Sequence, residues 1–111
     1  MNKRSLLLGT LSTAEEVLPK EIRILGNYPN PFNPLTNILF SLDRDSDILL
    51  KVFDSKGRLI KILSGGNKSA GNHSVFWDGT NQKGIIVPTG VYFYRLESNQ
   101  QYFSGKMMFL K

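Results

Sequence analysis

The chain has 111 residues, of which 41% are apolar and 11% aromatic, and its formal net charge is +5 at pH 7. A chain of this length forms one domain, and this composition supplies an ordinary hydrophobic core instead of a disordered chain. The absence of cysteine excludes disulfides, thiol nucleophiles and zinc–thiolate sites. Lysines and arginines are scattered, with no run longer than Lys3-Arg4, so the sequence predicts no basic stripe for nucleic acid.

Residues 1–20 differ in character from the rest of the chain. They combine a basic start with a short apolar run, Leu6 to Leu11, that is interrupted by Gly9 and Thr10. This pattern resembles a shortened secretory signal peptide. We expect the segment to be a linker, a fragment boundary or a weak signal-like segment. No apolar stretch approaches the ~18 residues that a membrane-spanning helix needs, so we expect no transmembrane segment.

From residue 21 onward apolar and polar residues alternate with period two, which predicts short strands with one buried and one exposed face. The expected strands, in chain order, are an irregular one through Ile22 and Ile24 toward Tyr28, and then 36–42, 48–54, 58–63, 73–77, 91–98 and 101–111.

The expected connections are a charged turn at 43–47, a hairpin at 55–57, a longer glycine-rich loop at 64–72, a long loop at 78–90 and a last hairpin at Asn99. Seven short strands separated by such turns predict an all-β fold, an immunoglobulin-like antiparallel β-sandwich over residues 21–111.

The stretch GNYPNPFNP, residues 26–34, precedes the first clear strand. Each proline fixes its own φ and holds the preceding residue extended, and Asn30 and Asn33 can stabilise turns. We therefore expect a stiff segment anchored by the packing of Tyr28 and Phe32. In the late strand we expect Tyr92, Tyr94 and Leu96 to face the core, with Phe93 on the other face and a tyrosine hydroxyl bound to backbone.

Few residues offer chemistry. His73 is the only histidine, and Ser74 and Ser104, the serines that a catalytic triad would use, stand in no nucleophile-elbow motif. We expect His73 to pack beside Trp77 or to face solvent. The aspartates of 43–47 and the loop at 78–84 offer oxygen ligands for calcium, but turns capped by their own side chains explain both patterns. We expect no enzyme and no cofactor.

Four stretches, in this order, resemble the type A C-terminal sorting domain of the type IX secretion system: NYPNPFNPLTNILFSL, LKVFDSKGRLIKIL, AGNHSVFWDGTNQKGIIVPTGVYFYRL and SGKMMFLK. The same stretches are similar to the immunoglobulin-like domain of the flagellar hook-capping protein. The resemblance covers residues 25–111, and Thr89 stands where the family typically has proline. Carried over by position, its motif residues are Asn30, Pro31, Phe32, Pro34, Asp54, Gly57, Trp77, Asp78, Gly79, Gly90, Tyr92, Tyr94, Leu96, Lys106, Met107 and Lys111.

This resemblance implies a non-catalytic secretion and sorting domain of a Gram-negative bacterium, in the Bacteroidetes or their relatives. The implied partners are an outer-membrane secretion translocon, a surface sortase and a cargo domain fused upstream, and the implied location is secreted or at the outer membrane and cell surface. We expect the last hairpin to present its backbone and the Lys106–Lys111 end at a sheet edge. The proline-rich segment would then be a rigid spacer behind the cargo.

Two alternatives remain open. The chain could be a structural or adhesive immunoglobulin-like module, such as a hook-cap-like assembly domain that associates through edge strands. It could also be a carbohydrate-binding accessory domain that stacks sugars on Tyr92, Phe93 or Tyr102.

Overall fold

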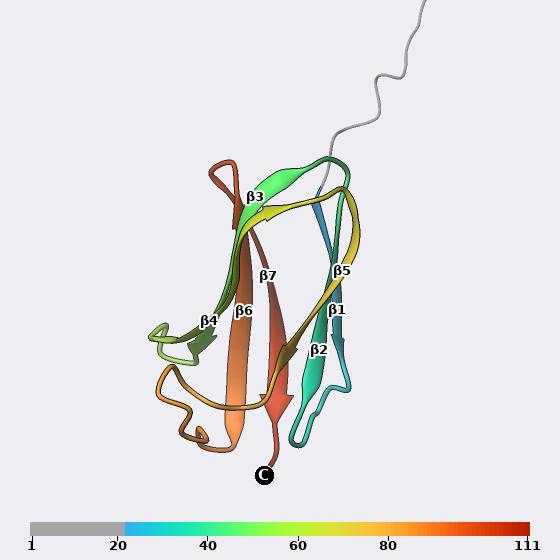
Figure 1. Ribbon diagram of the computed structural model, residues 1–111. Coiled ribbons are helices and arrows are strands. Elements are labelled where there is room, and N and C mark those ends of the chain that lie inside the picture. The colour runs from blue at the N-terminus through green and yellow to red at the C-terminus, as the bar shows by residue number, and fades with distance from the viewer. Residues whose placement is uncertain (1–21) are drawn as a thin grey trace, which may run out of the picture.

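The computed structural model describes residues 22–111, which form seven strands in two facing sheets (Figure 1). The strands are β1 (Ile22–Tyr28), β2 (Thr36–Leu42), β3 (Ser46–Asp54), β4 (Leu59–Lys68), β5 (Gly71–Trp77), β6 (Gly90–Ser98) and β7 (Gln101–Phe109). One sheet has the order β1-β2-β5 and the other β4-β3-β6-β7, and all neighbours are antiparallel. The expected immunoglobulin-like sandwich is confirmed. The predictions for residues 1–20 lie outside the described residues.

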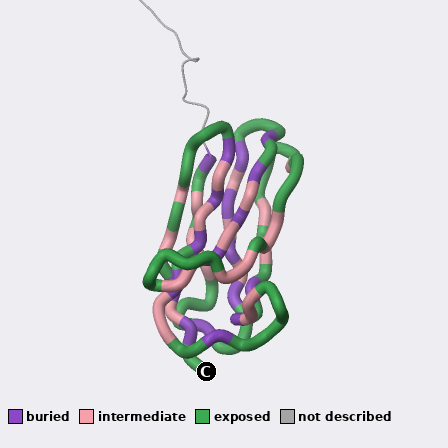
Figure 2. Tube along the Cα trace, turned by 90° about the vertical axis from the view of Figure 1, so that its left-hand side faces the viewer, coloured by how far each residue is buried: buried purple, intermediate pink, exposed green. Residues whose placement is uncertain are grey.

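The core lies between the sheets and follows the alternation of the sequence (Figure 2). Tyr92, Tyr94 and Leu96 are 4%, 2% and 0% exposed, while Phe93 is 37% exposed on the outer face, as predicted. Burying each large apolar side chain stabilises the fold by roughly 1.5–3 kcal/mol. Members of the core from the other strands include Ile38, Phe40, Leu42, Ile48, Leu50, Val52, Trp77, Met107 and Phe109.

The prediction of a long loop at 64–72 is wrong. β4 continues to Lys68 and β5 begins at Gly71, so only two residues separate them. Gly65 and Gly66 lie opposite Leu49 and Ile48 of β3. The backbone ladder with β3 therefore extends through a stretch whose glycines carry no side-chain alternation, and that is why the pattern missed it.

Tyr28 is not a packing anchor: it is 74% exposed. β1 contains a register shift between Ile24 and Gly26, and Gly26 has φ +112°. An extra residue in a strand moves every following side chain to the opposite face of the sheet. Counting by twos from Ile22 therefore placed Tyr28 on the wrong face.

Both outer edges of the four-stranded sheet are covered by irregular segments at one end of the sandwich. Beside β7, the Phe32 amide donates to the Met108 carbonyl (2.9 Å) and the Leu110 amide donates to the Phe32 carbonyl (3.0 Å). Beside β4, the Gln82 amide donates to the Ile60 carbonyl at 3.1 Å. These bonds cover strand edges that would otherwise be templates for pairing with other chains.

The proline-rich segment is thus part of the sandwich and not a free spacer. Phe32 forms a parallel bridge with Phe109, and its side chain is 1% exposed. The expectation of a rigid spacer failed because the backbone amide and carbonyl of Phe32 bond to Met108 and Leu110, which lie more than 70 residues later in the chain.

The pairing of Tyr94 with Gly105 gives a test of the core. Tyr94 lies opposite Gly105, and a Cβ at that glycine would overlap the Tyr94 ring and hydroxyl. We expect Gly105→Ala to lower the free energy of unfolding, measured in urea, by about 1–3 kcal/mol. In a Tyr94→Leu background, where the end of the ring is absent, the same substitution should cost clearly less. An equal cost in both backgrounds would contradict this packing.

Candidate functional site

Three of the motif residues carried over from the sequence, Phe32, Trp77 and Tyr92, meet Phe109 at one end of the sandwich. The Phe32 ring lies 5.4 Å from Trp77 and 5.0 Å from Phe109, and Trp77 lies 5.2 Å from Tyr92, between ring centroids. All four side chains are at most 4% exposed. We call these four residues the aromatic cluster. Phe109 was not among the motif residues predicted from the sequence. The one sequence feature that could have identified it as buried is its two-residue spacing from Met107 along the last strand.

The glycine of the W-D-G motif is required by this cluster. Gly79 has φ +76°, and a Cβ there would lie 2.8 Å from the Phe109 ring. A side chain at this position would be strained in its backbone and would also push Phe109 out of the cluster.

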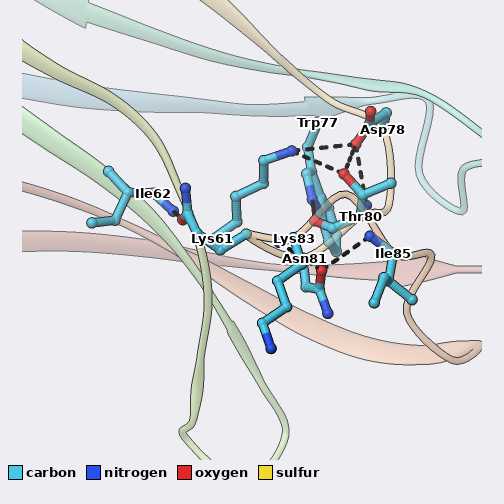
Figure 3. Close-up of polar contacts among 9 residues, drawn as sticks. Lys61, Ile62, Trp77, Asp78, Thr80, Asn81, Lys83 and Ile85 are labelled. Carbon is cyan, nitrogen blue, oxygen red and sulfur yellow. Dashed lines mark hydrogen bonds and ion pairs between the residues drawn. The ribbon is translucent and has the colours of Figure 1, made fainter.

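Polar contacts hold the loop that follows Trp77 (Figure 3). The Trp77 indole Nε1 donates to the Thr80 carbonyl at 2.9 Å. Asp78 Oδ1 accepts from the amide and the hydroxyl of Thr80, at 3.1 and 2.5 Å, and Lys61 Nζ lies 3.8 Å from the same oxygen. The Thr80 hydroxyl bond, with a smaller contribution from the charge of Lys61, holds the pKa of Asp78 below its ordinary value.

The next turn of this loop is capped by Asn81. Its Oδ1 accepts from the amides of Lys83 and Ile85, at 2.9 and 3.0 Å. The side-chain oxygens of Asp78 and Asn81 thus cap turns, as the turn interpretation of this stretch predicts. Across residues 22–111 there is no group of three or more His, Cys, Asp or Glu placed to hold a metal ion.

Asp54 and Gly57 form the hairpin between β3 and β4. Asp54 Oδ1 accepts from the amides of Arg58 and Lys56, both at 2.9 Å, and Oδ2 accepts from Arg58 Nε at 2.8 Å. Gly57, with φ +82°, donates its amide to the Asp54 carbonyl. The bond from the Arg58 amide contributes most to lowering the pKa of Asp54 below its ordinary value.

The late strand and the C-terminal end divide into buried and exposed positions. The Tyr92 hydroxyl donates to the Pro88 carbonyl at 2.6 Å, which confirms the expected bond to backbone. Met107 is 1% exposed, whereas Lys106 and Lys111 are exposed. The Lys111 amide donates to the hydroxyl of Thr89, the residue that precedes Gly90.

Asn30 is exposed, but its side-chain amide forms two hydrogen bonds. Its Nδ2 donates to the Lys106 carbonyl at 3.3 Å, and its Oδ1 accepts from the Met108 amide at 2.9 Å. The side-chain amide thus imitates the backbone of a neighbouring strand. Pro31 and Pro34 are exposed on the same segment.

His73 does not pack beside Trp77. Its ring stacks on Phe40, its cross-strand neighbour, at 5.3 Å, and its Nε2 lies 2.7 Å from the Ser69 carbonyl. Ser74 donates its hydroxyl to Asn37 instead. The structure therefore brings no triad together at this histidine. Residues 22–111 also contain no helix long and apolar enough to cross a bilayer.

Comparison with known proteins identifies the family. Residues 34–101, more than half of the chain, match the family model described as the FlgD Ig-like domain. The chain belongs to the FlgD Ig-like domain family. No curated protein matches the sequence.

Solved structures share the Ig-like fold at low sequence identity. PorU from Porphyromonas gingivalis matches 90% of this chain with a TM-score of 0.69 and 19% identity. FlgD from P. aeruginosa matches 67% of this chain with a TM-score of 0.55 and 23% identity. PorZ, an essential surface component of the type IX secretion system of P. gingivalis, matches 81% of this chain with a TM-score of 0.52 and 18% identity. The chain spans only 10%, 59% and 11% of those proteins. These likenesses show the fold alone.

The bounds of the FlgD Ig-like match divide the carried-over motif. The match contains Asp54, Trp77, Asp78, Gly79 and the Gly90–Leu96 strand, but it begins after Phe32 and ends before Lys106. Most of the motif residues inside the match have a structural role: they cap turns, allow tight turns or belong to the core. The two segments outside the match, which hold Asn30–Phe32 and Lys106–Lys111, bind each other.

The burial of Phe32 predicts its contribution to stability. We expect Phe32→Ala to lower the free energy of unfolding by about 3–5 kcal/mol, because it empties the space between Trp77 and Phe109. Phe93→Ala, which removes the same side chain from the outer face of β6, should cost clearly less. Similar shifts of the urea midpoint for the two variants would contradict the assigned core.

The lowered pKa of Asp54 predicts a pH dependence. The folded form holds the ionised carboxylate better than the unfolded form, so its stabilisation is complete above the unfolded pKa, about 4, and is lost as the pH falls through the folded pKa. We expect Asp54→Asn to flatten the decline in stability below pH 4, measured by urea unfolding. Asp43→Asn, at a carboxylate 3.9 Å from exposed Arg44, is the control. An acid decline unchanged by Asp54→Asn would refute the assignment.

Proposed function

We propose that this Ig-like domain is a non-catalytic C-terminal sorting domain that directs a cargo protein through the type IX secretion system to the cell surface or the medium. The order of its sequence motifs supports this function, and so does the shared fold with PorZ, whose description names that system. The observation that carries the proposal is the mutual contact of residues 30–32 with the C-terminal end, because these segments lie outside the FlgD Ig-like match.

The partners of this function are an outer-membrane translocon, a surface sortase and cargo fused upstream. β7 is an edge strand, as expected for the last hairpin and its Lys106–Lys111 end. Asn30 and Phe32 nevertheless occupy polar groups of Lys106, Met108 and Leu110 on that edge, so its backbone is only partly presented. With these groups occupied, the receptor would recognise exposed side chains at this end: Lys106, Lys111 and Leu110, which is 44% exposed. Two cations around an apolar side chain suit an acidic receptor surface.

Charge removal at this end tests the proposal without disturbing the core. We expect a reporter fused to the chain to accumulate in the periplasm of a type IX-competent bacterium when it carries Lys106→Ala and Lys111→Ala. The pair Lys56→Ala and Lys83→Ala removes the same charge from exposed positions elsewhere and should leave export intact. Thermal unfolding of both variants verifies their folding. Normal export of the first pair would count against the proposal.

A second candidate is a structural or adhesive module, favoured by the family match and by the FlgD structure. In that function the exposed lysines at the end of the chain are dispensable, so both charge variants would behave alike. For the carbohydrate-binding alternative, Tyr92 is excluded as a stacking surface because it is 4% exposed. Tyr102, 64% exposed, remains available, and loss of glycan binding in Tyr102→Ala would support that function.

A further inference from the structure

The C-terminal half of β7 is held on its two edges in different ways. One edge pairs with β6 in a regular ladder from Gly90–Phe109 to Ser98–Gln101. The other edge is held near its end by a three-residue segment, Asn30–Phe32. Four hydrogen bonds join them: Asn30 Nδ2 to the Lys106 carbonyl, the Met108 amide to Asn30 Oδ1, the Phe32 amide to the Met108 carbonyl, and the Leu110 amide to the Phe32 carbonyl.

This segment has a single buried anchor. Of residues 29–35 only Phe32 is buried, and the others are exposed. Phe32 packs between Trp77 and Phe109, with ring centroids 5.4 and 5.0 Å away. Segments with few buried contacts open at a lower free energy than core strands do. The packing contacts of the Phe32 ring and the hydrogen bonds of the segment should therefore be lost together when the segment moves away from β7.

We propose that Asn30–Phe32 is a latch that opens without unfolding of the sandwich. Opening frees the outer edge of β7 from Lys106 to Leu110 and empties the site of the Phe32 ring. The exposed surface then combines a row of backbone donors and acceptors with an apolar pocket, which is the arrangement that binds an added peptide strand. Its ligand is an extended peptide with an asparagine and, two residues later, an aromatic residue. The latch is the intramolecular copy of that ligand.

The latch is closed by default. It is joined to the chain at both ends, so its effective concentration at the site is about millimolar or higher. A partner strand gains access only when the latch is weakened or displaced. The use of this opening as a gate for the translocon rests on the proposed function, whereas the opening itself does not.

Hydrogen exchange on the full chain tests the opening. Met108 and Leu110 direct their amides to the latch, and because successive amides of a strand point to opposite edges, those of Met107 and Phe109 point to β6. We expect the first two amides to exchange faster than the second two. Equal exchange of all four amides would show that the edge opens only with the whole strand, and would overturn the proposal.

A matched pair of asparagines adds a second test. Asn30→Ala removes two bonds to β7, and we expect it to speed exchange of the Met108 and Leu110 amides, and trimming of residues 106–110 by a carboxypeptidase, about tenfold. Asn33→Ala, at an exposed asparagine of the same segment, should change neither rate. Equal effects of the two variants would overturn the assignment of the latch.

The predicted ligand is tested by adding it in trans. We expect a synthetic peptide of residues 26–34, GNYPNPFNP, to restore slow exchange of the Met108 and Leu110 amides in Phe32→Ala, while the same peptide with alanine for phenylalanine does not. Phe32→Leu takes the place of Phe32→Ala if that variant does not fold. Absence of any restoration would refute the peptide site. These measurements use the purified chain, so their failure leaves the export proposal standing, and a failed export experiment leaves the latch standing.

Discussion

Closure of one end of the sandwich depends on the insertion of the Phe32 ring between Trp77 and Phe109. It joins the connection that precedes β2 to the end of β5 and to the last strand. Full burial of such a ring stabilises a fold by roughly 2–3 kcal/mol, and aromatic pairs add about 0.5–1.5 kcal/mol beyond their buried area. Both sheets therefore share one core at the end of the molecule where the chain terminates.

This constraint changes the meaning of the motif that first suggested a sorting domain. Trp77, Gly79 and Tyr92 build or accommodate the aromatic cluster, and Asp54 and Asp78 cap the turns beside it. All five of these residues lie within the FlgD Ig-like match, and their contacts serve the fold itself. The features that would distinguish the proposed sorting domain from a purely structural one therefore lie among the exposed positions and in the two segments outside that match.

Local sequence patterns predicted most of the strands, but not the contacts that join the start of the sandwich to its last strand. Alternation identified β2, β3 and β6 and the inward tyrosines, because a strand with one buried face repeats every two residues. The register shift between Ile24 and Gly26, by contrast, reversed the face of Tyr28, and the glycines of β4 have no side chains whose alternation could be recognised. The bonds of Asn30 with Lys106 and Met108 join residues 76 and 78 positions apart, which no local signal in one sequence reveals.

The central claim is that Phe32 and Phe109 stabilise the domain as a pair that ties the start of the sandwich to its end. A double-mutant cycle of Phe32→Leu and Phe109→Leu, followed by urea unfolding, measures this coupling directly. The account predicts a coupling free energy of about 0.5–1.5 kcal/mol, with the double variant less destabilised than the sum of the single ones. Additive effects of the two substitutions would contradict it.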